Sequence, residues 1–135
     1  MIKKTTFLIL IFFSINNITA QEQNKNSEKF PVNLFISADK TIYVETQKTN
    51  FENIENYISE IIRNKPFKLD QKIVYRIFAD ENLNLGYIMD VNQEMLSAYD
   101  DNVKTERFLL NTIELNIDGQ NWFEKIKMNK VEKIN

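Results

Sequence analysis

The first twenty residues, MIKKTTFLILIFFSINNITA, have the pattern of an export signal, which decides how much of the chain is left to fold. Lys3 and Lys4 form a positive start, residues 7–13 form a short apolar stretch, and Ala20 is the small residue at which a signal peptidase cuts. A membrane-spanning helix needs roughly 20 apolar residues, and this stretch is much shorter. We therefore expect residues 21–135 to be periplasmic or secreted after cleavage, without membrane insertion.

The residue types available to this mature chain limit its chemistry. The sequence has no cysteine and no histidine, so the fold is held by its core rather than by disulfides, and the usual general base, metal ligand and thiol nucleophile are all absent. The whole chain has 19 acidic and 17 basic residues, and removal of Lys3 and Lys4 increases the acidic excess. We expect no nucleic-acid partner, no metal, no cofactor and no enzymatic activity.

The polar stretch 21–30 is typical of a disordered leader, so we expect a single domain over residues 31–118. Alternating apolar residues predict strands at 32–37 and 41–45, and the short link between them predicts a hairpin.

A helix is predicted next, because Thr49 and Glu52 have the spacing of a capping box. Apolar residues then recur at three- and four-residue intervals and form one stripe, which consists of Phe51, Ile54, Ile58, Ile61 and Ile62. Pro66 prevents continuation, so the helix should end near Asn64.

The second half of the domain repeats the alternation of strand and helix. Residues 73–79 are β-branched and aromatic and predict an inner strand. Residues 84–99 predict a weaker amphipathic helix, with Ile88, Val91, Met95 and Ala98 on its apolar face. Residues 107–117 predict a last strand. In the tail, 119–135, an amphipathic spacing from residue 121 onward is compatible with a helix, although repeated Lys and Asn weaken it.

The predicted element order is therefore β-β-α-β-α-β. This order favours a two-layer α+β sandwich, in which two helices pack on one face of a mixed sheet.

Two segments carry a resemblance to a known family. The segment VNLFISADKTIYV (32–44) reads as an apolar strand, a short Asp-containing turn and a second strand, and IVYRIFAD (73–80) is followed by Leu85-Gly86 at a helix start. Together they resemble the periplasmic domain of the ExbD/TolR family over Val32 to Met95. The resemblance implies a periplasmic fold, pairing as a homodimer or with another ExbD/TolR-like envelope protein, and contact with peptidoglycan.

The sequence also departs from that family. Members of the family are inner-membrane proteins whose single spanning helix carries a proton-responsive aspartate. We find neither the span nor that aspartate in this sequence, so proton-driven transport is not part of the expectation.

Three acidic residues are candidates for chemistry. Asp80 follows the inner strand, where sites of α/β proteins are often placed, but an aspartate there more often binds loop amides. Asp80 and Glu81 are a candidate carboxylate pair or cation site, yet no third acid at metal-loop spacing accompanies them. Asp39 lies in the hairpin turn and is a weaker candidate. We assign none of them a catalytic or metal-binding role.

Two further features have a packing interpretation. Gly86 is expected to relieve crowding at a helix start rather than to bind phosphate, because no glycine-rich loop surrounds it. Trp122 and Phe123 are candidates for an exposed aromatic anchor, but closure of the open end of a small core is favoured.

The sequence thus favours a non-enzymatic interaction module of the bacterial envelope, with β-addition at a sheet edge as its simplest mechanism. One alternative is a carboxylate-dependent periplasmic hydrolase that uses Asp80 and Glu81, and another is a purely structural secreted domain. A pocket that holds Asp80 with a lysine or a second acid would favour the hydrolase.

Overall fold

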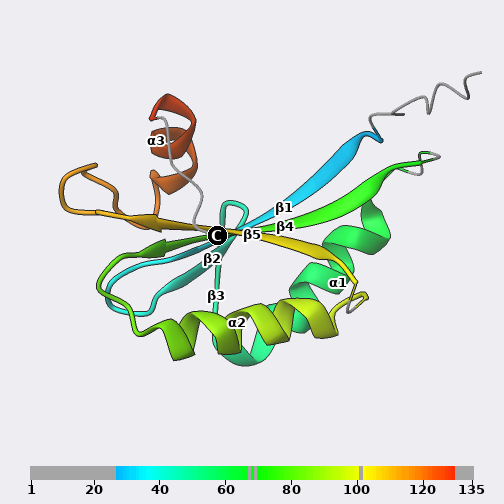
Figure 1. The fold of residues 1–135 in the computed structure, drawn as a ribbon, viewed down its shortest axis with the longest axis horizontal. Helices are drawn as coiled ribbons and strands as arrows, with labels where there is room; N and C mark the ends of the chain where they lie inside the picture. Colours follow the sequence, from blue (N-terminus) through cyan, green and yellow to red (C-terminus); the bar gives the residue numbers. More distant parts are fainter. Residues whose placement is uncertain (1–26, 67, 69, 101, 130–135) are drawn as a thin grey trace, which may run out of the picture.

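A computed structural model of the chain describes residues 27–66, 68, 70–100 and 102–129 (Figure 1). The expected export signal and residues 21–26 of the expected leader lie outside the described residues. Within the described part, none of the helices has the length and apolar character needed to cross a bilayer.

The described residues form a five-stranded mixed sheet with helices on both faces. The elements are β1 (Lys29–Ile36), β2 (Ile42–Val44), β3 (Gln47–Thr49), the short 3₁₀ helix η1 (Phe51–Asn53), α1 (Ile54–Asn64), β4 (Lys72–Asp80), α2 (Leu85–Ser97), β5 (Lys104–Leu110) and α3 (Trp122–Met128). The strand order is β3-β2-β1-β4-β5, with β1, β4 and β5 parallel and β2 antiparallel to both of its neighbours. α1 and α2 lie on one face and α3 on the other (Figure 1). The predicted α+β class, with two helices on one face of a mixed sheet, is confirmed.

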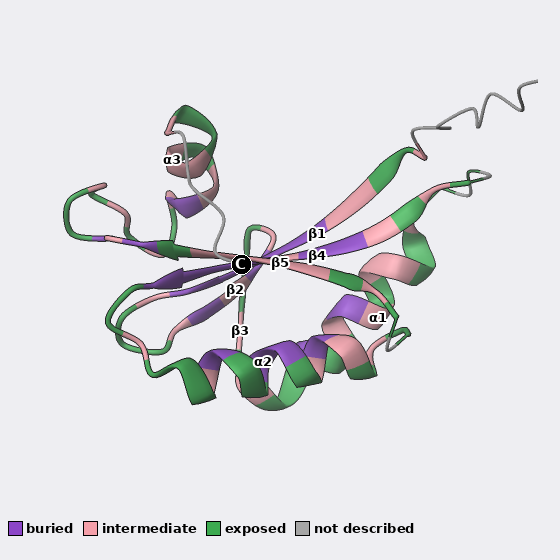
Figure 2. Ribbon diagram, viewed as in Figure 1, coloured by how far each residue is buried: buried purple, intermediate pink, exposed green. Residues whose placement is uncertain are grey.

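The centre of the sheet is the parallel pair β1 and β4. These strands are in register from Lys29 opposite Lys72 to Ile36 opposite Ala79. Residues 32–36 are all buried, so β1 is covered on both faces (Figure 2). A strand that is buried on both sides reads as a nearly continuous apolar run, which is the pattern of this segment.

The main core lies between the sheet and the first two helices. The stripe predicted for α1 faces the sheet, since Ile54 and Ile58 are completely buried. α2 contributes Ile88, Val91 and Met95, which are also buried. The core cluster is completed by aliphatic residues of the strands, among them Val32, Leu34, Ile36 and Ile77.

The opposite face has a smaller, largely aromatic cluster. Trp122 is 1% exposed and stacks on Phe35, with ring centroids 5.5 Å apart and planes 10° apart. Phe78 stacks on Phe108 at 4.7 Å and also contacts the Trp122 ring at 5.8 Å. The expected core-closing role of Trp122 is therefore confirmed. α3 belongs to the fold, although its residues were assigned to a tail beyond the domain.

The start of the first helix differs from the prediction. Thr49 ends β3, a strand that was not predicted, so the capping box of Thr49 and Glu52 is wrong. Asn50 is the cap, and its Oδ1 accepts a hydrogen bond from the Asn53 amide at 3.1 Å. Asparagine competes well with threonine at this position because its short side chain reaches the free amides of the first turn.

The strand bounds in two other places also differ. β1 begins at Lys29, inside the stretch expected to be leader. β5 spans Lys104–Leu110, so the predicted strand 107–117 begins too late and continues too far. After β5 the chain turns, because Asn111 Oδ1 accepts from the Glu114 amide at 3.0 Å and Asn116 adopts a φ of 51°. Asparagine tolerates this left-handed conformation better than the alternating residues around it.

Candidate functional site

Asp80 lies at the carboxyl end of β4 and is 1% exposed. One carboxylate oxygen accepts the amide of Asn82 at 2.9 Å, and the other accepts the Thr112 hydroxyl. The first bond is the loop-amide contact expected of an aspartate at this position. The second joins β4 to the turn that follows β5.

These contacts also determine the ionisation of Asp80. Burial alone would raise the pKa of its carboxyl, but the hydrogen bonds from Thr112 and Asn82 favour the charged form more strongly, so the pKa is lowered. An anionic, fully engaged carboxylate is suited to holding a loop and poorly suited to general-acid chemistry at neutral pH.

Glu81 does not complete a catalytic pair with Asp80. Its side chain is exposed while that of Asp80 is buried, and its main-chain amide donates to the Leu110 carbonyl at 2.8 Å. In the described part of the chain, no three histidine, cysteine or carboxylate side chains gather in a way that could hold a metal ion.

Asp39 caps the turn between β1 and β2. Its carboxylate accepts from the Ser37 hydroxyl and from the Thr41 amide, the latter at 3.1 Å, while Lys40 takes a φ of 65°. The Ser37 hydrogen bond is the main reason that the pKa of Asp39 is lowered. Asp39 thus stabilises the hairpin turn.

A shallow hollow of about 440 Å³ lies beside this turn. Its lining includes Asp39, Lys48, Thr112 and Asp118, but neither Asp80 nor Glu81. Asp80 also does not line the larger hollow described below. Neither hollow is therefore the pocket around Asp80 that would favour the hydrolase.

The two glycines have different packing roles. The Gly86 amide donates to Asn84 Oδ1 at 2.7 Å, and a Cβ at Gly86 would lie 3.0 Å from that oxygen. Gly86 therefore allows the Asn84 cap at the start of α2, as expected. A Cβ at Gly119 would lie 2.4 Å from the Tyr43 ring, so any larger residue would force this ring to shift. No periodic pattern in the sequence indicates this second contact, because it joins a loop to a distant strand.

The two edges of the sheet differ in length. β3 is one edge and has three residues, whereas β5 is the other edge and has seven. The Leu110 carbonyl bonds to the residue after β4, and main-chain groups alternate in direction along a strand. The main-chain groups of Thr105, Arg107 and Leu109 therefore point to the outer side of β5, where no described strand pairs with them.

Large apolar side chains are also exposed on β5 and on α2. Leu109 on β5 is 39% exposed, and Leu85 and Met89 on the preceding helix α2 are 61% and 42% exposed. An edge strand whose outer main-chain groups meet no described strand and which carries an exposed apolar side chain, Leu109, is suited to pairing with another chain.

Comparison with known proteins identifies no relative: neither a protein-family model nor a curated protein sequence matches this chain.

Proposed function

We propose that this protein is an exported, non-enzymatic interaction module of the bacterial envelope, which pairs through β5 with a second copy of itself or with a membrane-anchored ExbD/TolR-like protein. The envelope setting rests on the signal pattern in residues 1–20. The choice of partner rests on the resemblance of residues 32–44 and 73–80 to the ExbD/TolR periplasmic domain.

The observation that carries the proposal is the outer edge of β5, which no strand of the described residues pairs with. Thr105, Arg107 and Leu109 present their main-chain donors and acceptors outward, and a second β5 strand running antiparallel would satisfy them on both chains. Such a contact is self-complementary under a two-fold axis, as expected for a homodimer. A homologous partner would offer the same edge.

β3 is less suited to this role. It has only three residues, and short edge strands are a common device that limits unwanted pairing. β5 is long enough for several inter-chain hydrogen bonds, although Lys104 and Arg107 would restrict pairing to partners that accommodate their charge.

The hydrolase alternative receives less support. It would require Asp80 to reach a substrate, whereas this side chain is 1% exposed and both of its oxygens accept hydrogen bonds within the fold.

Removal of one outward amide tests the proposal. Arg107→Pro deletes an N–H that does not belong to the ladder with β4, so the sheet should keep its register while pairing across the edge is blocked. Arg107→Gln is the matched control, because it removes the same charge and keeps the amide. Sedimentation velocity should show a dimer for the wild type and for Arg107→Gln, and a monomer for Arg107→Pro.

Crosslinking in intact cells examines the partner. We expect a homodimer or a complex with a membrane-anchored homologue, and Asp80→Asn should leave this complex unchanged. A strictly monomeric wild type that captures no envelope protein, together with a hydrolytic activity lost in Asp80→Asn, would overturn the proposal in favour of the enzyme.

A further inference from the structure

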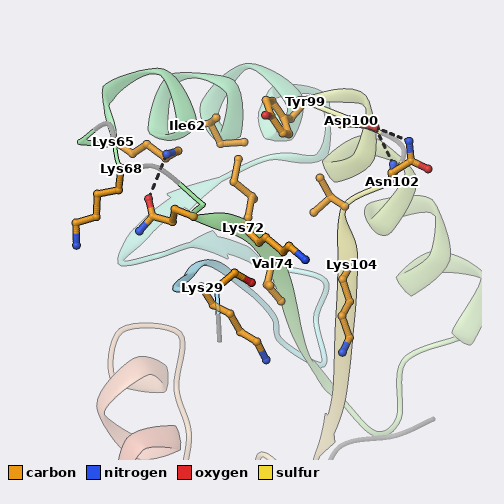
Figure 3. Close-up of a pocket in the computed structure, with 14 residues that line it drawn as sticks. Lys29, Ile62, Lys65, Lys68, Lys72, Val74, Tyr99, Asp100, Asn102 and Lys104 are labelled. Carbon is orange, nitrogen blue, oxygen red and sulfur yellow. Dashed lines mark hydrogen bonds between the residues drawn. The ribbon is translucent and has the colours of Figure 1, made fainter. Parts of the chain in front are cut away.

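A hollow of about 850 Å³ lies at the amino ends of the three parallel strands, next to the carboxyl ends of α1 and α2 (Figure 3). This volume is in the range of small-molecule sites. The polar part of its lining is dominated by lysine, and its main members are Lys29, Lys65, Lys68, Lys72, Lys104 and Tyr99.

Three of these lysines come from neighbouring strands. Lys29 on β1 is directly opposite Lys72 on β4, and Lys104 on β5 is opposite Val74, two positions further along β4. Neighbouring strands are about 4.8 Å apart, and side chains two residues apart share a face. The three lysines therefore lie side by side on the face opposite α1 and α2, as the close-up shows (Figure 3).

The charge of these lysines is only partly neutralised. Lys104 has one carboxylate partner, Glu106, at 3.8 Å. Within the described residues, Lys29 and Lys72 have no ion pair at all. Exposed like charges at such spacing repel one another, so an anion placed between them would be bound favourably.

The other lysines of the hollow add to this field. Lys68 pairs with Glu28 at 2.9 Å, whereas Lys65 donates to the neutral amide of Gln71 at 3.2 Å. Among the described residues of the lining, Asp100 is the one carboxylate, and its Oδ1 already accepts from the amide and the side chain of Asn102. The hollow is thus strongly basic in a chain whose acidic residues outnumber its basic ones.

The apolar part of the lining consists of Ile62, Ile73, Val74 and Val103. Ile62, Ile73 and Val103 pack against the core under α1 and α2, so the strand lysines are the part of the lining that can contact an anion on the opposite face. The Tyr75 hydroxyl has no hydrogen-bond partner among the described residues, and burial, followed by smaller contributions from Tyr99 and Asp100 of the same lining, raises its pKa to about 12.

From this arrangement we infer that the hollow binds a phosphate-bearing ligand, either the headgroup of a phospholipid or a free phosphate compound. The described lining has no arginine, so it lacks the planar fork that recognises carboxylates bidentately. A phosphate has several oxygens and up to two negative charges, which separate lysines on separate strands can each contact. This inference does not rest on the proposed pairing through β5.

Titration calorimetry on the purified full chain tests it with three probes: soluble dihexanoyl phosphatidic acid, inorganic pyrophosphate and citrate. We expect at least one phosphate probe to bind and citrate to bind more weakly. The triple variant K29Q/K72Q/K104Q should lose about 100-fold in affinity, since each lysine near a phosphate contributes roughly fivefold.

A second triple variant, K40Q/K48Q/K127Q, removes the same charge from exposed sites outside the hollow and should bind like the wild type. Thermal melts of both variants should match the wild type, because all six side chains are exposed.

The probes also separate the two sources of phosphate. Binding of phosphatidic acid alone identifies a lipid headgroup, and equal binding of pyrophosphate identifies a free phosphate compound. No binding of either phosphate probe, citrate binding as tightly as phosphate, or an equal loss in the two triple variants would each overturn the inference.

Discussion

The two faces of the sheet are built in different ways. Under α1 and α2, small contributions from many aliphatic side chains such as Leu34, Ile58 and Val91 form a continuous core. Under α3, a few large rings around Trp122 cover one half of the face, and the other half carries the polar residues Asn33, Arg76 and Glu106. The stability of the first face is therefore distributed over many residues, whereas the stability of the second depends on one or two large side chains.

The polar residues of the second face form hydrogen bonds with defined partners. Arg76 and Glu106 are opposite each other in the register of β4 and β5, and Arg76 Nε donates to Glu106 Oε2 at 3.3 Å. Asn33 donates its main-chain amide to the Glu45 carboxylate at 2.7 Å. This face therefore holds charged groups that can respond to solution conditions, which the aliphatic face does not.

The largest expected effect is on the aliphatic face. Ile58→Asp places a charge without a partner in a completely buried position and should destabilise the protein by more than about 4 kcal/mol. Glu55→Ala, at an exposed position of the same helix, should change the free energy of unfolding by less than about 0.5 kcal/mol. Denaturant titrations that do not distinguish the two variants would mean that α1 does not pack on the sheet as described.

The aromatic face should respond strongly to one residue. Trp122→Ala removes the ring that contacts Phe35 and Phe78 and should cost about 3 kcal/mol. Unfolding followed by far-ultraviolet circular dichroism should remain a single transition, shifted to lower denaturant. If the midpoint did not move, α3 would be an appendage rather than part of the fold, and the two faces would differ more than we describe.

The charged groups predict opposite pH dependences. Hydrogen bonding lowers the pKa of Asp80 from 3.8, so its stabilising contribution is complete above pH 3.8 and is lost as the pH falls through the folded-state pKa. Asp80→Asn should thus cost about 1–3 kcal/mol at neutral pH, and the difference from the wild type should shrink in acid.

Glu45 is a second carboxyl group for comparison, and its pKa is shifted in the opposite direction. Burial raises the pKa of its carboxyl above 4.5 despite the Asn33 hydrogen bonds, so its relative contribution is complete below pH 4.5 and is lost as the pH rises through the folded-state pKa. Stability measured against pH for Glu45→Gln and Asp80→Asn should give differences from wild type that change in opposite directions. Parallel curves would contradict the opposite directions assigned to the two pKa shifts.

The smallest expected effect concerns the cap at the start of the first helix. Asn50→Ala should destabilise the protein by about 1 kcal/mol because it removes the cap on the Asn53 amide. Thr49→Ala should cost less, since Thr49 lies in the edge strand β3 and not at the cap. Equal losses of thermal stability in the Asn50 and Thr49 variants would support the capping box predicted from the sequence.

Periodic patterns were the reliable part of the sequence. The stripe that includes Ile54 and Ile58 predicted both the existence and the buried face of α1, whereas β1 was predicted from alternating apolar residues and β4 from a β-branched and aromatic run. All three elements contribute to the aliphatic core, so their buried residues recur with the period of a helix or a strand.

What the sequence did not predict depends on backbone pairing, turn geometry and strand register rather than on a periodic pattern of apolar residues. β3 has three polar residues and exists because it pairs with β2, and β5 stops at Leu110 because Asn111 and Asn116 form turns. The hollow is invisible in the sequence because its lysines, such as Lys29 and Lys104, are far apart in the chain and meet only through strand register. The net charge of the chain indicated no anion site, because it averages the local excess of lysine in the hollow with the acidic residues elsewhere.

The order of the strands in the sheet has a consequence for synthesis. β4 lies between β1 and β5 in space, but β5 is made only after α2. A chain that emerges from its amino end can pair the strands from β3 to β4 early. β4, which contains Ile77, Phe78 and Ala79, then remains an edge strand until residues 104–110 are available to pair with it. During this interval the nascent chain is most exposed to aggregation, so a delay or truncation before β5 should harm its solubility more than one after it.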